Sequence, residues 1–494
     1  MRLMSPTTSL SPADLAPIVA RLQPTNAHLA RRYPGESGAR QPVHTVYGGA
    51  QLFAADTVPK LGQLALRAMD EYAPDPHTLA EAIGLALSDD RDLRLAQAVH
   101  QRVRDKLQRE AVEDFRIDYE DGYGVRPDAE EDHHAEAGAR AIARGLENNT
   151  LSPFIGLRVK PMTAELHARS LRTLDIFLTT LVRDAGRLPD RFFITLPKVT
   201  AVDQVTAFVD ALEQLEPRLG LPARSLRFET MVETPQLIVD ETGRSLLPSL
   251  IDAAHGRLTA AHFGTYDYTA SLNITAAYQR MRHITCDFAK SVMQVALAGT
   301  GIWLSDGSTT VMPVPMHRRA ADAPALSPQQ IAENRASVHN AWRMHYDDVR
   351  HSLESGFYQG WDLHPAQLVT RYAAVYTFFL TGVDQQAARL RNFVERAAQA
   401  TLVGDVFDDA ATGQGLLNFF FRAINCGALA EHEAVAMTGV TLDELRSRSF
   451  VRILQKGFSE RKSAVSCLLD TAEPKPESAR RGDPLSTLPT FHTR

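Results

Sequence analysis

Cysteine is scarce in this chain. The 494 residues include three cysteines, Cys286, Cys426 and Cys467, and no two of them are spaced as a CxxC pair. Cysteines so few and so widely separated exclude the disulfide framework that holds many small secreted domains together. We therefore expect a protein of the reducing cytoplasm.

Charge of one sign and long hydrophobic runs are also lacking. The 53 basic residues are balanced by 59 acidic ones, for a net charge of −6, and without a basic patch nucleic acid is not an expected partner. No segment reaches the roughly 18 apolar residues that a membrane span needs. The first residues, MRLMSP, lack the charged head and apolar core of a signal peptide. We expect no membrane partner.

Several common catalytic signatures are missing. The chain has neither a P-loop nor a GxGxxG turn after a strand, so the use of ATP or NAD is unsupported. It also has no GxSxG nucleophile elbow. The zinc-protease pattern HExxH begins at His432 but fails because Ala436 stands where the second histidine would be.

What the chain does have is a regular alternation of short apolar runs with stretches long enough for helices. Its composition, 44% hydrophobic and 23% charged, is that of an ordinary globular protein. Strands that alternate with helical patterns are typical of βαβ units and a parallel sheet. Eight of them indicate an α/β protein with a closed (β/α)8 TIM barrel. The predicted strands are residues 44–47, 115–119, 155–159, 192–196, 226–232, 261–266, 301–304 and 360–363.

The barrel does not account for the whole length, and four segments are expected. Residues 1–42 form an N-terminal helical segment, in which Ser11 and Pro12 mark a helix start. Residues 43–380 form the catalytic barrel, with room for about three helices between its first two strands. Residues 381–469 form a C-terminal helical region that contains the capping-box pattern Thr441 to Glu444. Residues 470–494, rich in proline and polar residues, are expected to be a disordered tail.

Two acidic residues follow neighbouring apolar runs. Successive side chains of a strand point to opposite faces, so Glu229 and Glu233 share one face, and Thr265 and Asp267 share one face of the next strand. In a parallel barrel Glu233 and Asp267 would converge at the C-terminal rim, where barrel enzymes keep their chemistry. Two carboxylates suit a hard divalent cation. This pairing predicts a metal-assisted enzyme.

Other predicted strand ends are charged or polar as well. After the second strand, Asp118 and Glu120 share a face and Asp121 lies in the turn. After the third, Arg158 and Lys160 share a face, and the later strands supply Lys198, Asp306 and His364. For any one of these residues a capped turn or a rim salt bridge is the simpler interpretation. The complete set of charged rim positions is stronger evidence for a functional site than any single residue.

As a set, these residues resemble the HpcH/HpaI aldolase and citrate lyase β-subunit superfamily. The resemblance spans residues 43–367 and rests on the segments DYED (118–121), Arg158, LPK (196–198), VET (232–234), FGTYD (263–267) and GWDLHPAQ (360–367). It implies a (β/α)8 barrel that uses Mg²⁺, Mn²⁺ or another divalent cation to bind a 2-oxo acid or an acyl-thioester and makes or breaks C–C bonds through an enolate. It also implies a homo-oligomer.

The resemblance suggests a role for each site residue. Glu233 and Asp267 correspond to the metal ligands and Arg158 to the enolate-stabilising arginine, while Glu120 and Asp121 correspond to the acidic strand end. Lys198 corresponds to the Pro-Lys strand end of the superfamily. This chain departs from the pattern in its length, in the extra acid Glu229 and in its helical C-terminal region.

Alternatives remain for several residues. Arg158 could form a structural ion pair with Glu120 or Asp121. Glu229 could be a third metal ligand, or it could balance Lys160 and Lys198, which we favour. His364, Asp306 and His283 are candidates for the general acid or base, which stays unassigned.

Three functions are compatible with this sequence. The first is a class II type aldolase, a divalent-metal carbon–carbon lyase acting on a 2-oxo acid such as pyruvate or on its aldol. The second is an acyl-CoA enzyme of the citrate lyase or malate synthase kind. The third is a barrel that has kept the site as a ligand sensor. A metal ion and a fixed arginine would both stabilise the negative oxygen of an enolate, and we favour the first function.

Overall fold

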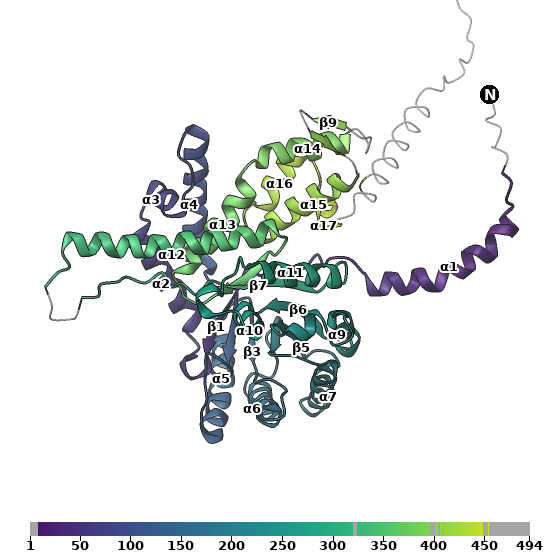
Figure 1. Cartoon of the computed structure of the whole chain (residues 1–494), viewed down its shortest axis with the longest axis horizontal. Helices are drawn as coiled ribbons and strands as arrows, with labels where there is room; N and C mark the ends of the chain where they lie inside the picture. The colour runs from purple at the N-terminus through teal and green to yellow at the C-terminus, as the bar shows by residue number, and fades with distance from the viewer. Residues whose placement is uncertain are drawn as a thin grey trace, which may run out of the picture.

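A computed structural model of the chain describes residues 8–319, 324–395, 401–403, 406–408, 410–447 and 453. Eight parallel strands close into a barrel in the order β1 to β8, so each strand pairs with its neighbours in sequence and β8 pairs with β1. Figure 1 shows the barrel surrounded by helices. The predicted TIM barrel is confirmed.

All eight predicted strands are present; β4 has the predicted ends, and each of the other seven is shifted at one or both ends. The strands are β1 (His44–Gly49), β2 (Asp114–Asp118), β3 (Phe154–Arg158), β4 (Phe192–Leu196), β5 (Arg227–Val232), β6 (Leu258–Phe263), β7 (Trp303–Ser308) and β8 (Gln359–Asp362). The difference that matters most for the site is at β6, which was predicted at residues 261–266. It ends at Phe263, and a helix begins two residues later.

Helices join the strands on the outside of the barrel. Three α-helices and the short 3-10 helix η1 lie between β1 and β2, where the length of the connection predicted about three helices. The second α-helix begins at Pro76 behind the capping side chain of Asp75. The helices up to β8 are η1 (Ala50–Leu52), α2 (Thr57–Tyr72), α3 (Pro76–Ile83), α4 (Asp90–Glu110), α5 (Asp128–Asn148), α6 (His167–Ala185), α7 (Val202–Arg218), α8 (Pro235–Ile238), α9 (Leu247–Ala253), α10 (Thr265–Ser271), η2 (Ala276–Tyr278), α11 (Ile284–Leu297) and α12 (Pro328–Glu354).

The strands are buried on both faces, as parallel barrel strands usually are. Every residue of β2, β3 and β4 is buried. Gly156 of β3 allows a close approach to β4, because a Cβ atom there would lie 1.7 Å from the carbonyl oxygen of Phe193. Apolar side chains of the strands pack against the surrounding helices, and the barrel interior holds charged side chains as well.

Further helices lie at both ends of the chain. The N-terminal helix α1 (Pro12–Arg32) has the predicted cap at Ser11 and projects away from the rest of the structure (Figure 1). After β8 come α13 (Gln367–Leu380), α14 (Val383–Glu395), the short strands β9 (Thr401–Val403) and β10 (Val406–Asp408), α15 (Ala410–Asn425), α16 (Glu431–Thr438) and α17 (Leu442–Ser447). The predicted tail at residues 470–494 lies outside the described residues. No described helix has the length and apolar character to cross a membrane.

Candidate active site

A cavity of about 330 Å³ opens at the C-terminal ends of the strands, the end of the barrel where TIM-barrel enzymes bind their substrates. Four of the predicted site residues line it, and Glu120 and Lys198 contact these four from the side. Its lining residues are Tyr47, Asp118, Asp121, Gly122, Arg158, Glu233, Gly264, Thr265, Tyr266, Asp267, Gly307, Ser308, Trp361 and Leu363.

Glu233 follows the last residue of β5 and is 1% exposed. Its Oε1 accepts a hydrogen bond of 2.7 Å from the backbone N–H of Lys198. The backbone of Gly264 packs against the carboxyl group, since a Cβ atom there would lie 2.5 Å from Glu233 Oε2. Burial and the nearby charge of Asp267 raise the pKa of Glu233 to about 8. The carboxyl group is thus held in one place and poorly solvated.

Asp267 does not lie on a strand, and this part of the prediction is wrong. β6 ends at Phe263, Gly264 is the N-cap, and Asp267 is the third residue of α10. An acidic side chain is favourable in the first turn of a helix because it faces unpaired backbone N–H groups. The turn of α10 still brings Asp267 to the cavity, where its side chain is 41% exposed.

Arg158 is fixed at the end of β3 by Asp118 of the neighbouring strand. Its Nε and a terminal nitrogen donate to the two carboxylate oxygens of Asp118 over 2.7 and 2.6 Å. Its other terminal nitrogen lies 3.0 Å from Glu120 and 3.5 Å from Asp121. The guanidinium also stacks over the ring of Tyr47, 4.9 Å from its centroid. The expected structural ion pairs exist, with Asp118 as an additional and closer partner.

The ammonium group of Lys198 lies among carboxylates. It donates to Glu120 and, over 3.2 Å, to Asp121, and it is 3.6 Å from Asp267. Lys198 has a φ of 49°, in the left-handed region that side chains other than glycine rarely adopt. This backbone turn directs its N–H to Glu233 and its side chain to the acids of the neighbouring strand ends.

Acidic groups outnumber basic ones at this mouth of the barrel. Arg158 and Lys198 face five carboxyl groups, those of Asp118, Glu120, Asp121, Glu233 and Asp267. Among the described residues no three His, Cys, Asp or Glu side chains are arranged to hold a metal ion. Mg²⁺ commonly takes only one or two carboxylates and completes its octahedron with water and substrate oxygens. Glu233 and Asp267 fit that donor set.

Glu229 has a different environment from the one we expected. It lies inside the barrel, where both of its oxygens accept hydrogen bonds of 3.0 Å from Arg116 and one accepts a further bond from Thr195. It therefore balances neither Lys160 nor Lys198. Lys160 instead pairs with Glu131 of α5 over 2.8 Å.

None of the three candidate acid–base residues lines the cavity. Asp306 is buried and binds Lys290 and Ser352 over 2.9 and 2.7 Å. His283 caps the N-terminus of α11, where it accepts a hydrogen bond from Thr285. His364 lines a neighbouring apolar cavity of about 160 Å³.

Sequence reasoning missed two aromatic residues of the site, Tyr47 and Trp361. Both line the cavity, and their rings pack against each other with centroids 4.6 Å apart. The Tyr47 hydroxyl and the Trp361 Nε1 are buried and lack a hydrogen-bond partner in the described structure. Their position in the first and last predicted strands, which are neighbours in a closed barrel, was the signal that could have found them. The apolar cavity meets the main one at Tyr47 and Leu363.

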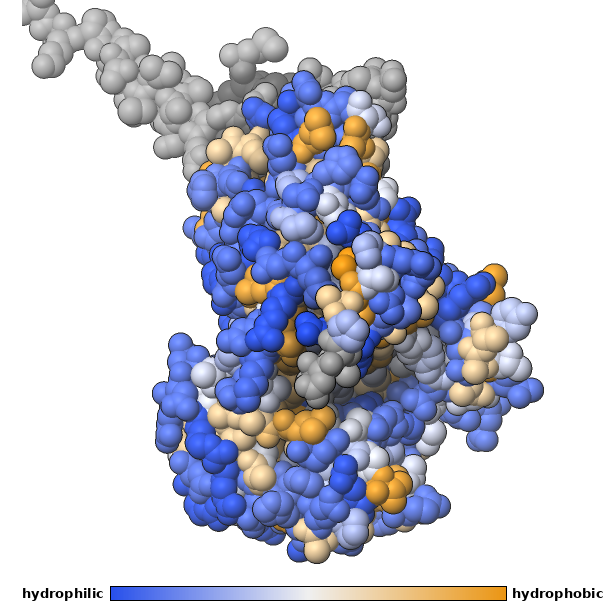
Figure 2. Space-filling view, turned by 90° about the vertical axis from the view of Figure 1, so that its left-hand side faces the viewer, coloured by the Kyte–Doolittle hydropathy of each residue, from blue (hydrophilic) through white to orange (hydrophobic). Residues whose placement is uncertain are grey.

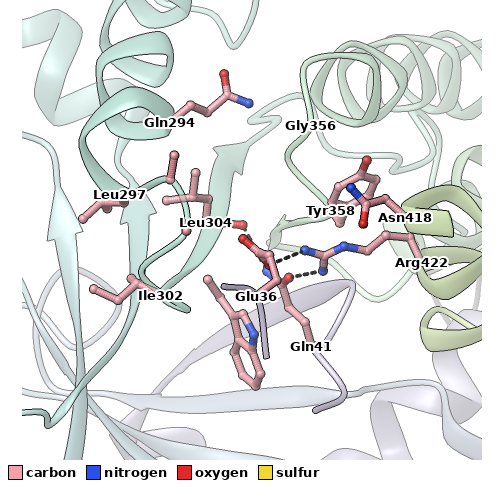
Figure 3. Close-up of a pocket in the computed structure, with 13 residues that line it drawn as sticks. Glu36, Gln41, Gln294, Leu297, Ile302, Leu304, Gly356, Tyr358, Asn418 and Arg422 are labelled. Atoms are coloured by element: carbon pink, nitrogen blue, oxygen red, sulfur yellow. Dashed lines mark hydrogen bonds and ion pairs between the residues drawn. The ribbon is translucent and has the colours of Figure 1, made fainter. Parts of the chain in front are cut away.

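A separate cavity of about 270 Å³ lies at the opposite end of the barrel (Figure 3). Here Arg422 of α15 donates to Gln41 over 2.6 Å and to Glu36 over 2.9 Å, and it stacks over Tyr358. The contacts with Glu36 and Gln41 connect α15 to the segment before β1, and the contact with Tyr358 connects it to the segment before β8. In TIM barrels this end of the strands contributes to stability, whereas the opposite end carries the chemistry.

Comparison with known proteins gives a family and a shared fold. A family model described as "Domain of unknown function (DUF6986)" matches residues 22–453. A search of curated proteins found no match.

Among solved structures, a citrate lyase from Burkholderia xenovorans is 18% identical, with a TM-score of 0.51 over 81% of this chain and 97% of that one. A Haloferax volcanii malate synthase, in a magnesium and glyoxylate complex, is 13% identical, with a TM-score of 0.42 over 84% and 96%. The CitE protein from Mycobacterium tuberculosis, in complex with magnesium, acetoacetate and coenzyme A, is 15% identical, with a TM-score of 0.41 over 79% and 99%. The similarity to the citrate lyase shows a shared fold.

Proposed function

The chain belongs to the DUF6986 family, and we propose that it is a divalent-metal-dependent carbon–carbon lyase of the class II aldolase type that acts on a 2-oxo acid or its aldol. The observation that carries this proposal is the imbalance of charge at the barrel mouth, where two basic side chains face five carboxyl groups around an open cavity. So many acids close together are costly unless a cation joins them.

Glu233 and Asp267 are the residues that would hold the metal ion. Glu233 is kept in place by the Lys198 backbone and by Gly264, and Asp267 by the first turn of α10. When bound, a divalent ion such as Mg²⁺ supplies Lewis-acid stabilisation of the negative oxygen that develops when a bond next to a carbonyl group breaks.

Arg158 would bind the oxyanion or the carboxylate of the substrate. Asp118 holds its guanidinium plane by two hydrogen bonds, so its donors do not need to reorganise during the reaction. Glu120 and Asp121 would position Arg158 and Lys198 by their ion pairs. Tyr47 would cover the other face of the guanidinium and keep water from it.

An acyl-thioester substrate is the second candidate. The observation that favours it is the apolar cavity of about 160 Å³ beside the site, which shares Tyr47 and Leu363 with the main cavity and contains Leu52, Phe53 and Leu61. A small 2-oxo acid such as pyruvate would leave that space empty, whereas the arm of a thioester could occupy it. Affinity for acetyl-CoA in the presence of Mg²⁺, measured by calorimetry, would favour this candidate over the first.

The proposal is tested by metal binding and by enolisation of a 2-oxo acid. With Mg²⁺ or Mn²⁺ present, we expect the protein to exchange the methyl protons of pyruvate for deuterium, as followed by NMR. Glu233→Gln and Asp267→Asn should lose metal affinity and exchange but keep the fold, as seen by circular dichroism. Asp190→Asn, at a carboxylate with 96% exposure, is the matched control.

Two outcomes would contradict the proposal. Intact metal affinity in both variants would show that Glu233 and Asp267 are not the ligands. Binding of metal and pyruvate without any proton exchange would indicate the ligand sensor instead of the lyase.

A further inference from the structure

Within the described part of its own chain, the N-terminal helix α1 contacts the barrel through its last residue, Arg32, and its apolar side chains remain exposed. It is 21 residues long, and none of them is buried. Figure 1 shows it extending away from the barrel. A helix of this length is ~31 Å long, so a large surface is presented to solvent.

Such a helix is not expected to be stable alone. It contains two internal prolines, Pro17 and Pro24, and a proline inside a helix costs about 3 kcal/mol because it removes a hydrogen bond and clashes with the preceding turn. Helical stability in proteins comes mainly from packing of an apolar face. The stability of α1 must therefore come from contacts with something outside the described chain.

The apolar face of α1 is well defined. Leu15, Ile18, Val19, Leu22 and Leu29 are 42–54% exposed and follow the i, i+3, i+4, i+7 spacing that places side chains on one side of a helix. The two prolines are seven residues apart on the opposite side, where water can bind the carbonyl groups that they leave unpaired. The apolar face is thus uninterrupted, as a packing surface should be.

A second unpaired apolar face lies on the barrel helix α11. Ile284, Phe288 and Val295 are 79%, 55% and 83% exposed, and spacings of four and seven residues place them along one side of the helix. The opposite side of α11 is buried in the barrel through Ala289, Met293 and other residues. On the face of the molecule seen in Figure 2, by contrast, hydrophobic residues lie in small groups among hydrophilic ones.

The base of α1 is anchored close to the end of α11. The N–H of Gly35 donates to the carbonyl of Gly299 over 2.8 Å, and Arg32 binds Asp252 and the carbonyl of Pro248 over 2.5 and 2.6 Å. From this anchor α1 runs outward, away from its own α11 (Figure 1). The α11 face of the same molecule is therefore out of reach, whereas that of another molecule is accessible.

We propose that two copies of this chain exchange their α1 helices, so that the apolar face of each α1 packs on the Ile284–Val295 face of α11 in the other copy. One chain carries both complementary faces, which is the condition for a self-complementary twofold interface. Each helix-on-helix contact can extend over at most the 14 residues of α11, ~21 Å, and the two contacts together bury on the order of 1,000 Å², the lower end for a specific protein interface. The inference is independent of the proposed lyase activity.

The test is the mass of the full-length protein in solution, measured by sedimentation velocity. We expect a dimer for the natural sequence and monomers for Leu22→Asp and for Phe288→Asp, because a buried charge at either face should weaken association by roughly 100-fold or more. The control variants are Ala20→Asp, on the opposite side of α1, and Leu64→Asp, at another exposed leucine; both should remain dimers. Circular dichroism checks that each variant is folded.

Mixing the two monomeric variants separates helix exchange from other arrangements. In the mixture, the intact α1 of the Phe288→Asp copy can pack on the intact α11 of the Leu22→Asp copy, so association should return in part. A monomeric natural protein, a dimer that survives Phe288→Asp, or a mixture that stays monomeric at high concentration would overturn the proposal. A dimer built from α1 against α1 would give the second result.

Discussion

Among the charged side chains of the barrel, one group is enclosed within the strands and another lies at the C-terminal mouth. In the enclosed group Arg116 binds both oxygens of Glu229 over 3.0 Å and also contacts Asp114, while Thr195 adds a hydrogen bond to Glu229. His262 lies 3.2 Å from Glu229. These polar groups bind one another, and all of them are at most 2% exposed.

The group at the mouth contains the same types of charged residue, but these are only partly enclosed. Asp118 and Glu120 hold Arg158 from one side. Glu233, Asp267 and Asp121 face an open cavity, and Lys198 lies 3.2 Å from Asp121 and 3.6 Å from Asp267. The carboxylates of the enclosed group are bound by Arg116 and shielded from solvent, whereas three carboxylates of the group at the mouth face an open cavity. Burial of charge alone therefore does not mark a functional site; an unbalanced charge beside a cavity does.

The largest effect should come from breaking the enclosed group. Arg116→Gln would leave two buried carboxylates with no cation, and removal of one partner from a buried ion pair costs about 3–5 kcal/mol. We expect the free energy of unfolding, measured in urea, to fall by that amount, and Mg²⁺ should not restore it. A loss below about 1 kcal/mol would show that this group is not a closed unit.

The corresponding change at the mouth should affect activity more than stability. Arg158→Gln removes the fixed donors, and loss of one such group commonly lowers the rate by about 100- to 1000-fold. Stability should fall less than in Arg116→Gln, because water from the cavity can solvate Asp118 and Glu120 and Lys198 remains beside Glu120. The readouts are pyruvate proton exchange and urea unfolding of the same two variants. Equal losses of stability with unchanged exchange would remove the distinction between the two groups.

The sequence predicted the fold better than the contacts of the site. Strand–helix alternation was enough for the eight strands, because buried parallel strands are short apolar runs. Asp267 was misplaced because Thr265 and Tyr266 continue an alternating pattern, although the strand ends at Phe263 and Gly264 is the N-cap of α10. Local patterns do not determine where a strand gives way to a helix.

The ion-pair partners depend on strand order and register. Asp118 of β2 lies opposite Arg158 of β3 in the register of the two strands, and Arg116 meets Glu229 across the barrel from a position 113 residues away. Alternation predicted that Glu229 points inward, but it contains no information about which cation lies on the other side. Several charged residues of the cavity could therefore be named from the sequence, although the candidates Asp306, His283 and His364 lie elsewhere. The ion pairs that these residues form could not be predicted.

The smallest effect we predict is a pH dependence that belongs to the enclosed group. Burial raises the pKa of Asp114 to about 6, against the opposing charge of Arg116 and with the help of the charge of Glu229. The ordinary value is 3.8, so between these two values the folded protein binds more protons than the unfolded chain. Stability should therefore fall as the pH rises through this window, by on the order of 1–3 kcal/mol.

Asp114→Asn isolates this contribution. The variant should lose the decline in stability between about pH 4 and pH 6, whereas the exposed control Asp190→Asn should keep it; both are measured by urea unfolding across the pH range. An unchanged profile in Asp114→Asn would show that Asp114 is not the group that binds this proton. Arg116 balances the charge of only one of the two enclosed carboxylates, so one bound proton neutralises the enclosed group. At the mouth, a cation from solution is required to balance the charge of the carboxylates.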